Sequence, residues 1–494
     1  MRSLVPLPVL LPLAGAAVSL VLHRQHLLQR VLGLAVLTGM LLTSIAVLVH
    51  VEAEGPVAVD VGAWAAPVGI TLVVDLFAAI MLVVSTAMVL AVLVYAIGSP
   101  RTSDEALFFH PVYLTLAAGV ALSFVTGDLF NLFVAFEVML TSSYVLITLG
   151  GRAEQVRTGM TYVVISLVAS LLFLTAVALL YAATGTVNMA DLAGRLDDVP
   201  DGLRDALALL LLVVFGIKAA IFPLFFWLPD AYPTAPTPVT AIFAGLLTKV
   251  GVYAIIRTQT LLFPSDGPST VLLVLAGATM VVGVLGAIAQ DDVKRILSFH
   301  IVSQIGYMIM GLGLFTVAGL AGAVFYITHH IVVKTTLFLV GGIIEQVTGT
   351  GALKRIGGLM HRIPVLALLF LVPALSLAGL PPFSGFVAKL ALVQAGLAID
   401  SGAIVAVSLL VSLLTLFSMT KIWAGVFWGL PEGVDTPAHE AGRLRAPALM
   451  VGATGALVLV SLGIALAAGP VYDLAVEAAE QLVDGAAYRE AVLG

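Results

Sequence analysis

Long apolar runs separated by short polar segments occupy almost the whole chain of 494 residues. A helix needs roughly 20 apolar residues to cross the hydrocarbon core of a bilayer. The runs reach this length about fourteen times, at 3–22, 28–49, 69–97, 107–126, 129–150, 158–183, 203–226, 238–261, 269–289, 295–314, 317–345, 363–398, 402–428 and 446–468. We therefore expect an all-α integral membrane protein with about fourteen transmembrane helices.

Composition agrees with this pattern and excludes several functions. The chain is 61% hydrophobic and 10% charged, whereas soluble domains are about 25% charged. Because cysteine is absent, disulfides, thiolate catalysis, Cys-ligated zinc and iron–sulfur clusters are excluded. No basic patch for nucleic acid, nucleophile–base set, phosphate loop or metal cluster stands out. We expect no cofactor, no metal and no stand-alone enzyme activity. The first run lacks a small-residue cleavage site, so it is interpreted as a retained helix.

Lysine and arginine are unevenly shared between alternate loops. With the N-terminus outside, twelve of the loop and terminal basic residues lie inside and five outside, Arg257 counted among the five. The inner face of a membrane protein carries the excess of positive charge. The sequence thus predicts a multi-pass protein of the cell membrane with both termini on the outer face.

The chain also contains an internal repeat. An offset of 163 residues pairs Asp128 with Asp291 and Glu137 with His300. An offset of 164 pairs the triplet 184–186 with 348–350, each Thr-Gly-Thr. Because each unit holds five spans, the second copy is expected to be inverted, as in many transporters. The predicted division is three N-terminal helices at 1–100, a first five-helix repeat at 107–262, an inverted repeat at 269–430, and a last span with an amphipathic tail at 431–494.

Two proline-rich segments predict broken helices. Proline removes a main-chain donor and clashes with the preceding turn. The segment 223–238 holds five prolines and interrupts or ends the seventh span, although an ordinary interhelical loop explains it equally well. The segment 380–385, Leu-Pro-Pro-Phe-Ser-Gly, lies inside the twelfth span. Irregular backbone at membrane depth is tolerated where it is buried in protein or lines a wet cavity.

Five basic residues are assigned to the interior of the spans, and all five are lysines: Lys218, Lys249, Lys334, Lys389 and Lys421. Every arginine is assigned to a loop or to a region near a span end. Arginine stays charged in proteins, whereas a buried lysine can lose its proton. A set of buried lysines is therefore suited to reversible proton binding, and ionisable groups at this depth are interpreted as functional. Lys421 is close to the end of its span, so we favour its extension to the membrane surface.

Acidic and histidine side chains complete a predicted proton pathway. Glu137 needs a cationic partner, and Lys218 is our choice, with a static ion pair as the alternative. His330 and Lys334 are four residues apart and share one helix face, and a neutral histidine can relay a proton. The secondary candidates are His329, for which packing is an equally good explanation, Asp75, for which packing or a cap-like role is equally good, and His300, for which a pathway role is the less favoured interpretation. Adjacent histidines without a carboxylate do not make a metal site.

Four motifs resemble one known family: FNLFVAFEVMLTSSY at 130–144, the segment 215–253 around Lys218 and Lys249, THHIVVKTTLF at 328–338 and SLAGLPPFSGFVAKL at 376–390. They are similar to the proton-translocating antiporter-like membrane subunits of respiratory complex I and of Mrp-type multisubunit Na⁺/H⁺ antiporters. Length and the motif of the twelfth span are most similar to the D-type subunit of the Mrp antiporters. The resemblance implies that Glu137 pairs with Lys218, that Lys249 bridges two halves, and that His330 and Lys389 continue a hydrated polar axis.

The expected function is proton translocation in a multisubunit monovalent cation (Na⁺ or K⁺)/proton antiporter. The expected partners are other membrane subunits of a hetero-oligomeric complex and the lipid bilayer. The alternative is a proton-pumping membrane subunit of a complex I-like quinone oxidoreductase or a membrane-bound hydrogenase, since no residue of this chain decides between the two. A purely structural subunit is a third interpretation, and it predicts that the buried lysines can be neutralised without effect.

Overall fold

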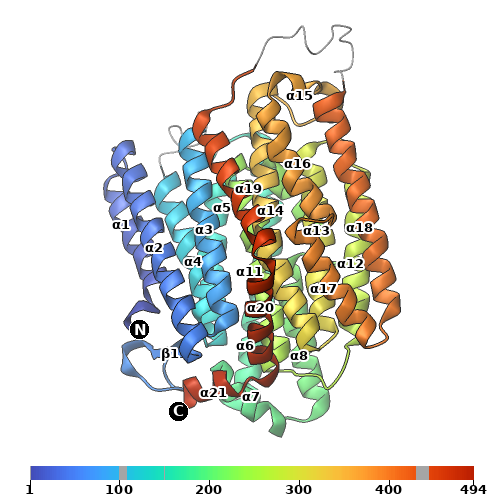
Figure 1. The fold of residues 1–494 in the computed structure, drawn as a ribbon. Coiled ribbons are helices and arrows are strands. Elements are labelled where there is room, and N and C mark those ends of the chain that lie inside the picture. Colours follow the sequence, from blue (N-terminus) through green and yellow to red (C-terminus); the bar gives the residue numbers. More distant parts are fainter. Residues whose placement is uncertain (1, 100–107, 150, 430–443) are drawn as a thin grey trace.

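A computed structural model describes residues 2–99, 108–149, 151–429 and 444–494, and most of them are helical. Figure 1 shows a bundle of long helices with the two termini at one end and the short helix α15 (Leu359–Arg362) at the other. The long helices are α1 (Leu7–Val21), α2 (His26–Glu54), α3 (Leu76–Gly98), α4 (Phe109–Val125), α5 (Leu129–Thr148), α6 (Ala153–Thr184), α8 (Asp201–Ala219), α12 (Thr270–Ile288), α13 (Val293–Gly313), α14 (Val317–Thr348), α18 (Gly402–Trp423) and α19 (Ala448–Leu466).

The helices occupy the predicted apolar ranges. Within the described residues, 11 helices are long and apolar enough to cross a membrane. The other three predicted ranges hold α4, α8 and the pair α16 (Pro364–Ala378) and α17 (Ser384–Ala398), which are shorter or, in α8, carry more charge. The all-helical membrane fold is confirmed, while the count of fourteen crossings and the domain boundaries stay predictions.

Both predicted breaks are present. Regular helix α8 stops at Ala219, and Ala220 adopts a left-handed conformation with φ 60°. The chain then forms turns and the one-turn helix α9 (Leu228–Ala231) before helix resumes with α10 (Thr237–Ile242). In the second break, α16 and α17 are separated by residues 379–383. The proline-rich segments therefore end regular helix inside the protein, as their sequence predicts.

One predicted span begins too early. The range 69–97 starts as a strand, β2 (Thr71–Val74), which pairs antiparallel with β1 (Val57–Asp60). Helix α3 begins only at Leu76, because the side chain of Asp75 caps it by accepting a hydrogen bond from the Ala78 main-chain N–H at 2.9 Å. The stretch Thr-Leu-Val-Val is apolar enough to extend the hydropathy signal, but its β-branched residues favour a strand.

The two units share a pattern of main-chain hydrogen bonds at a constant offset of 164 residues. In the first unit the Leu129 N–H donates to the Val187 carbonyl, and the Met189 N–H donates to the Gly127 carbonyl. The equivalent bonds of the second unit run from the Val293 N–H to the Gly351 carbonyl and from the Leu353 N–H to the Asp291 carbonyl. Asp128 caps α5 and Asp292 caps α13 in the same way. The pairing of Asp128 with Asp291 is therefore wrong by one residue, and Glu137 corresponds to Ile301 rather than to His300. Inversion of the second unit stays a prediction.

The C-terminal tail returns to the core as two helices, α20 (Ala468–Asp484) and α21 (Ala486–Leu493). Helix α20 packs against α14 and α3, and Figure 1 shows it running along the bundle toward the end that holds both termini. The side chain of Gln481 accepts a hydrogen bond from the Leu76 N–H at 3.0 Å. The tail therefore covers α14, the helix that carries the two histidines and Lys334.

Candidate ion-translocation site

The predicted pathway residues lie in the interior, on five different helices. Lys249, His330 and Lys334 are 0% exposed, and Lys218 and Lys389 are each 7% exposed. Glu137 on α5 is partly buried. Charged groups are costly to bury unless they are paired or can lose their charge. The burial of the lysines agrees with the sequence analysis, while their role in proton transfer stays a prediction.

Glu137 and Lys218 are joined by a third residue rather than by the direct ion pair that the sequence suggested. The Ser170 hydroxyl on α6 donates a hydrogen bond to Glu137 Oε1. The same hydroxyl accepts a hydrogen bond from Lys218 Nζ at 3.2 Å, and Nζ also donates to the Ser166 carbonyl at 3.1 Å. Carboxylate, hydroxyl and amine thus form a continuous hydrogen-bonded path. Sequence reasoning did not identify Ser170 as part of it.

We predict that Ser170→Ala slows transport by tenfold or more, because it removes the atom that connects the carboxylate to the amine. A lost hydrogen bond to a charged group is worth about 1.5–3 kcal/mol. The matched control is Ser142→Ala, whose hydroxyl donates only to the Val138 carbonyl of its own helix. Cation-driven proton movement in membrane vesicles measures both variants. Equal rates for Ser170→Ala and Ser142→Ala would contradict a bridging role.

Lys249 is held by an irregular turn. Residues Phe243–Leu247 form a π-helical turn between α10 and α11 (Thr248–Leu261). Lys249 Nζ donates to the Ala244 carbonyl in this turn at 2.6 Å and to Thr248 Oγ1 at 3.2 Å. Such turns are frequent at functional sites. The turn also presses Gly245 against α14, where an added Cβ would lie 2.3 Å from Thr335 Oγ1.

Helix α14 carries buried polar atoms that make no hydrogen bond within the described part of the chain. Both ring nitrogens of His330, Lys334 Nζ and Thr335 Oγ1 make no hydrogen bond among the described residues. The His330 and Lys334 side chains interact electrostatically with Lys249 across the helix contact. Buried polar atoms are nearly always satisfied, and where protein does not do so, ordered water does. This part of the axis is therefore the part best suited to a chain of water molecules.

Lys389 lies at the second break. Its Nζ donates to the carbonyls of Leu377 at 3.0 Å and Ala378 at 3.1 Å, at the end of α16, and to Ser412 Oγ at 3.0 Å. The Nζ also lies 5.0 Å from the centroid of the Tyr307 ring. The carbonyl end of a helix carries partial negative charge. The break therefore creates a cation site at the end of α16, and the sequence predicted the break and the lysine but not this contact.

Two secondary candidates, His329 and His300, lie close to Lys389. His329 Nδ1 hydrogen-bonds to Ser384 Oγ, the first residue of α17, at 2.8 Å. His300 Nε2 hydrogen-bonds to Ser418 Oγ on α18 at 2.9 Å, and its Nδ1 has no partner among the described residues. Both histidines interact electrostatically with Lys389. The structure therefore brings them close to the pathway, whereas spacing alone gave His329 no neighbour.

Asp75 has a different setting. It forms an ion pair with Arg257 at 2.7 Å, and the two side chains are 1% and 4% exposed. The guanidinium also lies 4.9 Å from the Tyr488 ring centroid, on the C-terminal helix α21. The assignment of Arg257 to an outer loop is thus wrong, because the last turns of α11 are covered by α3 and the returning tail. This geometry favours a structural role for Asp75.

Removing one member of this pair is expected to destabilise the protein strongly. Breaking a buried pair leaves an uncompensated charge and costs about 3–5 kcal/mol. We therefore expect Asp75→Ala to lower the thermal unfolding midpoint of the purified protein, and Asp75→Ala combined with Arg257→Leu to recover much of the loss. A double variant no more stable than the single one would argue against the pair as the cause.

Lys421 behaves as a surface residue. Its Nζ donates to the carbonyls of Ile288 and Gln290 and forms an ion pair with Asp291 at 2.7 Å. The hydrogen bond from Lys421 and its positive charge lower the pKa of the Asp291 carboxyl below its ordinary value. The pair is partly exposed, which agrees with the expected extension of Lys421 to the membrane surface.

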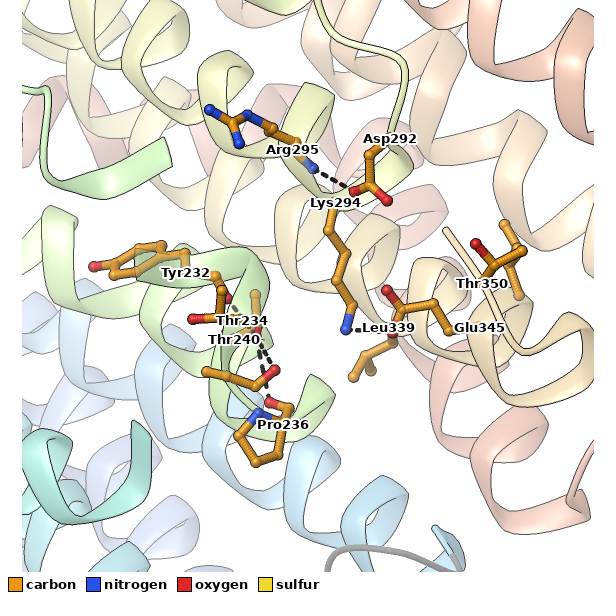
Figure 2. A network of polar contacts seen from close by, with 12 residues as sticks. Tyr232, Thr234, Pro236, Thr240, Asp292, Lys294, Arg295, Leu339, Glu345 and Thr350 are labelled. Atoms are coloured by element: carbon orange, nitrogen blue, oxygen red, sulfur yellow. Dashed lines mark hydrogen bonds and ion pairs between the residues drawn. The ribbon is translucent and has the colours of Figure 1, made fainter. Parts of the chain in front are cut away.

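A second ion pair was missed by sequence reasoning. Lys294, which lies near a span end and was expected in a loop, is 3% exposed, and its Nζ lies 2.5 Å from Glu345 Oε2 at the end of α14. Figure 2 shows Lys294 reaching across from α13 toward Glu345, with Asp292 and Thr350 beside them. Both residues lie at helix ends, where a charge is normally solvated. Only the fold reveals that they face one another.

Comparison with known families decides the classification. Residues 126–415 match the family described as NADH:quinone oxidoreductase/Mrp antiporter, transmembrane. This range contains α5 to α18 up to residue 415, and thus every pathway candidate except Asp75. The chain belongs to this family. The resemblance of the four motifs is thereby confirmed, and membership places the buried lysines in a family whose description covers both antiporters and a redox enzyme.

Individual family members extend the match to the whole chain. The D-type subunit of the Na⁺/H⁺ antiporter of Alkalihalophilus pseudofirmus is 46% identical over 100% of both chains. A chain of the Mrp complex from a Dietzia species has a TM-score of 0.92 and 36% identity, with full coverage of both chains. A chain of an archaeal membrane-bound sulfane sulfur reductase, a respiratory complex, has a TM-score of 0.91 and 27% identity, also with full coverage.

Proposed function

We propose that this chain is the proton-translocating subunit of a multisubunit monovalent cation/proton antiporter of the Mrp type. The observation that carries the proposal is the series of buried titratable side chains from Glu137 through Lys249 to Lys389, set at two helix breaks and a π-helical turn. Its 46% identity to the D-type subunit of a Na⁺/H⁺ antiporter over the full length supports the same conclusion. The chain is then a transporter subunit and not an enzyme in the ordinary sense.

In this proposal a proton moves by short steps along the membrane plane. It passes from the Glu137–Ser170–Lys218 path to Lys249, then to His330 and Lys334, and leaves near Lys389. Lysine suits these steps because burial weakens its hold on the proton. Partner membrane subunits couple this movement to Na⁺ or K⁺ exchange. Both termini lie on the outer face of the cell membrane, which agrees with their position at one end of the bundle (Figure 1).

The proposal predicts that Lys218→Ala or Glu137→Ala abolishes antiport while the complex still assembles. Each substitution removes one end of the path that Ser170 connects, so no proton can cross it. Cation-driven pH change in vesicles, with subunit content checked by mass spectrometry, measures the effect. Antiport that survives both substitutions would rule the proposal out.

A second function is favoured by one observation, the likeness to a chain of an archaeal respiratory complex. In that case the same proton path would be driven by a redox reaction in other subunits. Purification of the native complex separates the two cases. Small hydrophobic partner subunits support the antiporter, and iron–sulfur or flavin subunits support the redox complex.

A further inference from the structure

A polar cleft of about 820 Å³ opens beside the start of α13 and the end of α14. Helix α7 (Met189–Arg195) follows the last residues of α6 and lies at the end of the bundle that holds both termini (Figure 1). Residues at the start of α6 line the cleft, so the cleft lies at the opposite end of the bundle. Charged side chains of both signs line it: Arg152, Arg157, Asp230, Asp292, Lys294, Arg295 and Glu345. A polar cleft of this size has room for many water molecules.

The floor of the cleft is the Lys294–Glu345 ion pair. Lys294 is 4% exposed and Glu345 is 31% exposed by side chain, so the carboxylate touches the cleft while the ammonium lies behind it. Asp292 is nearby, since a Cβ on Gly351 would lie 2.5 Å from Asp292 Oδ2 and 3.2 Å from Glu345 Oε1. Figure 2 shows Asp292, Lys294 and Glu345 grouped together. Glu345 is thus a titratable group between water and the protein interior.

Glu345 lies on the same side of α14 as the pathway residue Lys334. It lies eleven residues after Lys334 on the same helix, which is slightly more than three complete turns, so the two side chains share one face. The separation along the helix axis is roughly 16 Å. Both side chains belong to α14, whose 32 residues run without a break.

Polar groups are present between them. The Tyr95 hydroxyl on α3 donates to the Leu339 carbonyl at 2.9 Å. A Cβ on Gly342 would lie 2.6 Å from this hydroxyl, so Tyr95 packs on α14 within one turn of Glu345, with which it interacts electrostatically. Closer to Lys334, Thr335 Oγ1 has no partner among the described residues. A hydroxyl can both accept and donate a proton, so these groups fit a relay completed by water.

We propose that Glu345 exchanges protons between the cleft and Lys334 along α14, past Tyr95 and Thr335. The proposal rests on the proposed function, since it adds an access residue to the same pathway. The Glu345 carboxylate takes a proton from cleft water, and the resulting neutral acid gives it up toward the Lys334 amine, which becomes an ammonium. Lys294 keeps its proton throughout and holds the carboxylate in place.

The first test is Glu345→Gln in the complete complex, measured as cation-driven proton movement in vesicles. We expect at least a tenfold loss, with Glu345→Asp recovering much of the rate because it keeps a carboxylate. Asp230→Asn is the matched control: it lines the same cleft and removes a carboxylate paired with Arg295, but it is not on α14, and it should leave the rate within twofold. Wild-type rates for Glu345→Gln would overturn the proposal.

Lys249→Ala in the same preparations separates the access proposal from the proposed function. If Lys249→Ala is inactive and Glu345→Gln is fully active, the access proposal fails while the proposed function stands. If Lys249→Ala remains active, the proposed function itself fails.

The second test uses the absence of cysteine from the chain. Thr350→Cys places a single thiol at the cleft, and a bulky charged thiol reagent that cannot cross the membrane should block transport when added from that face. The controls are the cysteine-free chain and Met360→Cys, an exposed position on α15 at the same end of the bundle as the cleft. Full transport by a chain shown by mass to be modified at Thr350→Cys would contradict proton access through the cleft.

Discussion

Replacement of Lys249 by alanine is expected to abolish proton-coupled cation transport while the complex remains assembled. Lys249 is fully buried and lies between the Glu137–Lys218 path and the histidine-bearing helix α14. Its amine is the only titratable group in the described part of α10, the π-helical turn and the first turn of α11. With the amine removed, a proton would have to cross apolar protein, which is prohibitive.

The variant Lys249→Arg distinguishes proton transfer by Lys249 from a purely electrostatic role. Arginine keeps the positive charge but does not give up its proton in proteins. If Lys249 only supplied charge, Lys249→Arg would retain activity. If Lys249 transfers protons, the variant should be as inactive as Lys249→Ala. Initial rates in inverted vesicles, normalised to the amount of assembled complex, distinguish these outcomes, and an active arginine variant would contradict proton transfer at this position.

The second large effect is expected at Gly379, next to Lys389. Gly379 has a φ of 85°, and a Cβ at this position would lie 2.7 Å from Lys389 Cδ. Gly379→Ala therefore strains the backbone and displaces the lysine from the carbonyls of Leu377 and Ala378. We expect a loss of at least tenfold in transport, close to that of Lys389→Met, although the ammonium is still present.

Gly463→Ala is the matched control for this variant. Gly463 lies in helix α19, where an added Cβ meets nothing within 4 Å, and its φ is not left-handed. The same assay should give the wild-type rate, because alanine is favourable within a helix. Normal transport by Gly379→Ala would show that the position of Lys389 at the end of α16 does not matter.

Hydropathy and the chemistry of lysine were enough to predict the helices and the interior position of the lysines. A bilayer demands long apolar runs, so their length is informative. Proline acts on its own helix, so the breaks near Pro223 and Pro382 were also accessible from sequence. The same holds for His330 and Lys334, because their spacing on one helix decides that they share a face.

Contacts between distant helices were not accessible in this way. Ser170 is one of many serines in apolar spans, and only the packing of α6 against α5 and α8 makes it a bridge. The π-helical turn before Lys249 has no sequence signature of its own. Arg257 and Lys294 were expected in loops because they lie near span ends, where hydropathy cannot tell a solvated charge from one covered by another helix.

The repeat illustrates an intermediate case. The Thr-Gly-Thr triplets gave the correct offset of 164, since Gly185 and Gly349 both end a helix in the left-handed conformation. The acidic caps did not give this offset, because Asp291 and Asp292 are adjacent. Only the hydrogen bond that the Arg295 N–H donates to the Asp292 side chain identifies Asp292 as the cap.

We expect a cation gradient to drive protons through the buried residues of this chain. The most direct test uses the purified complex in proteoliposomes that contain no quinone, reductant or hydrogen. An imposed Na⁺ or K⁺ gradient should change the internal pH with wild-type and Lys421→Gln complexes, and should not with Lys249→Ala. No pH change with the wild-type complex, or an equal change with Lys249→Ala, would contradict proton translocation by these residues.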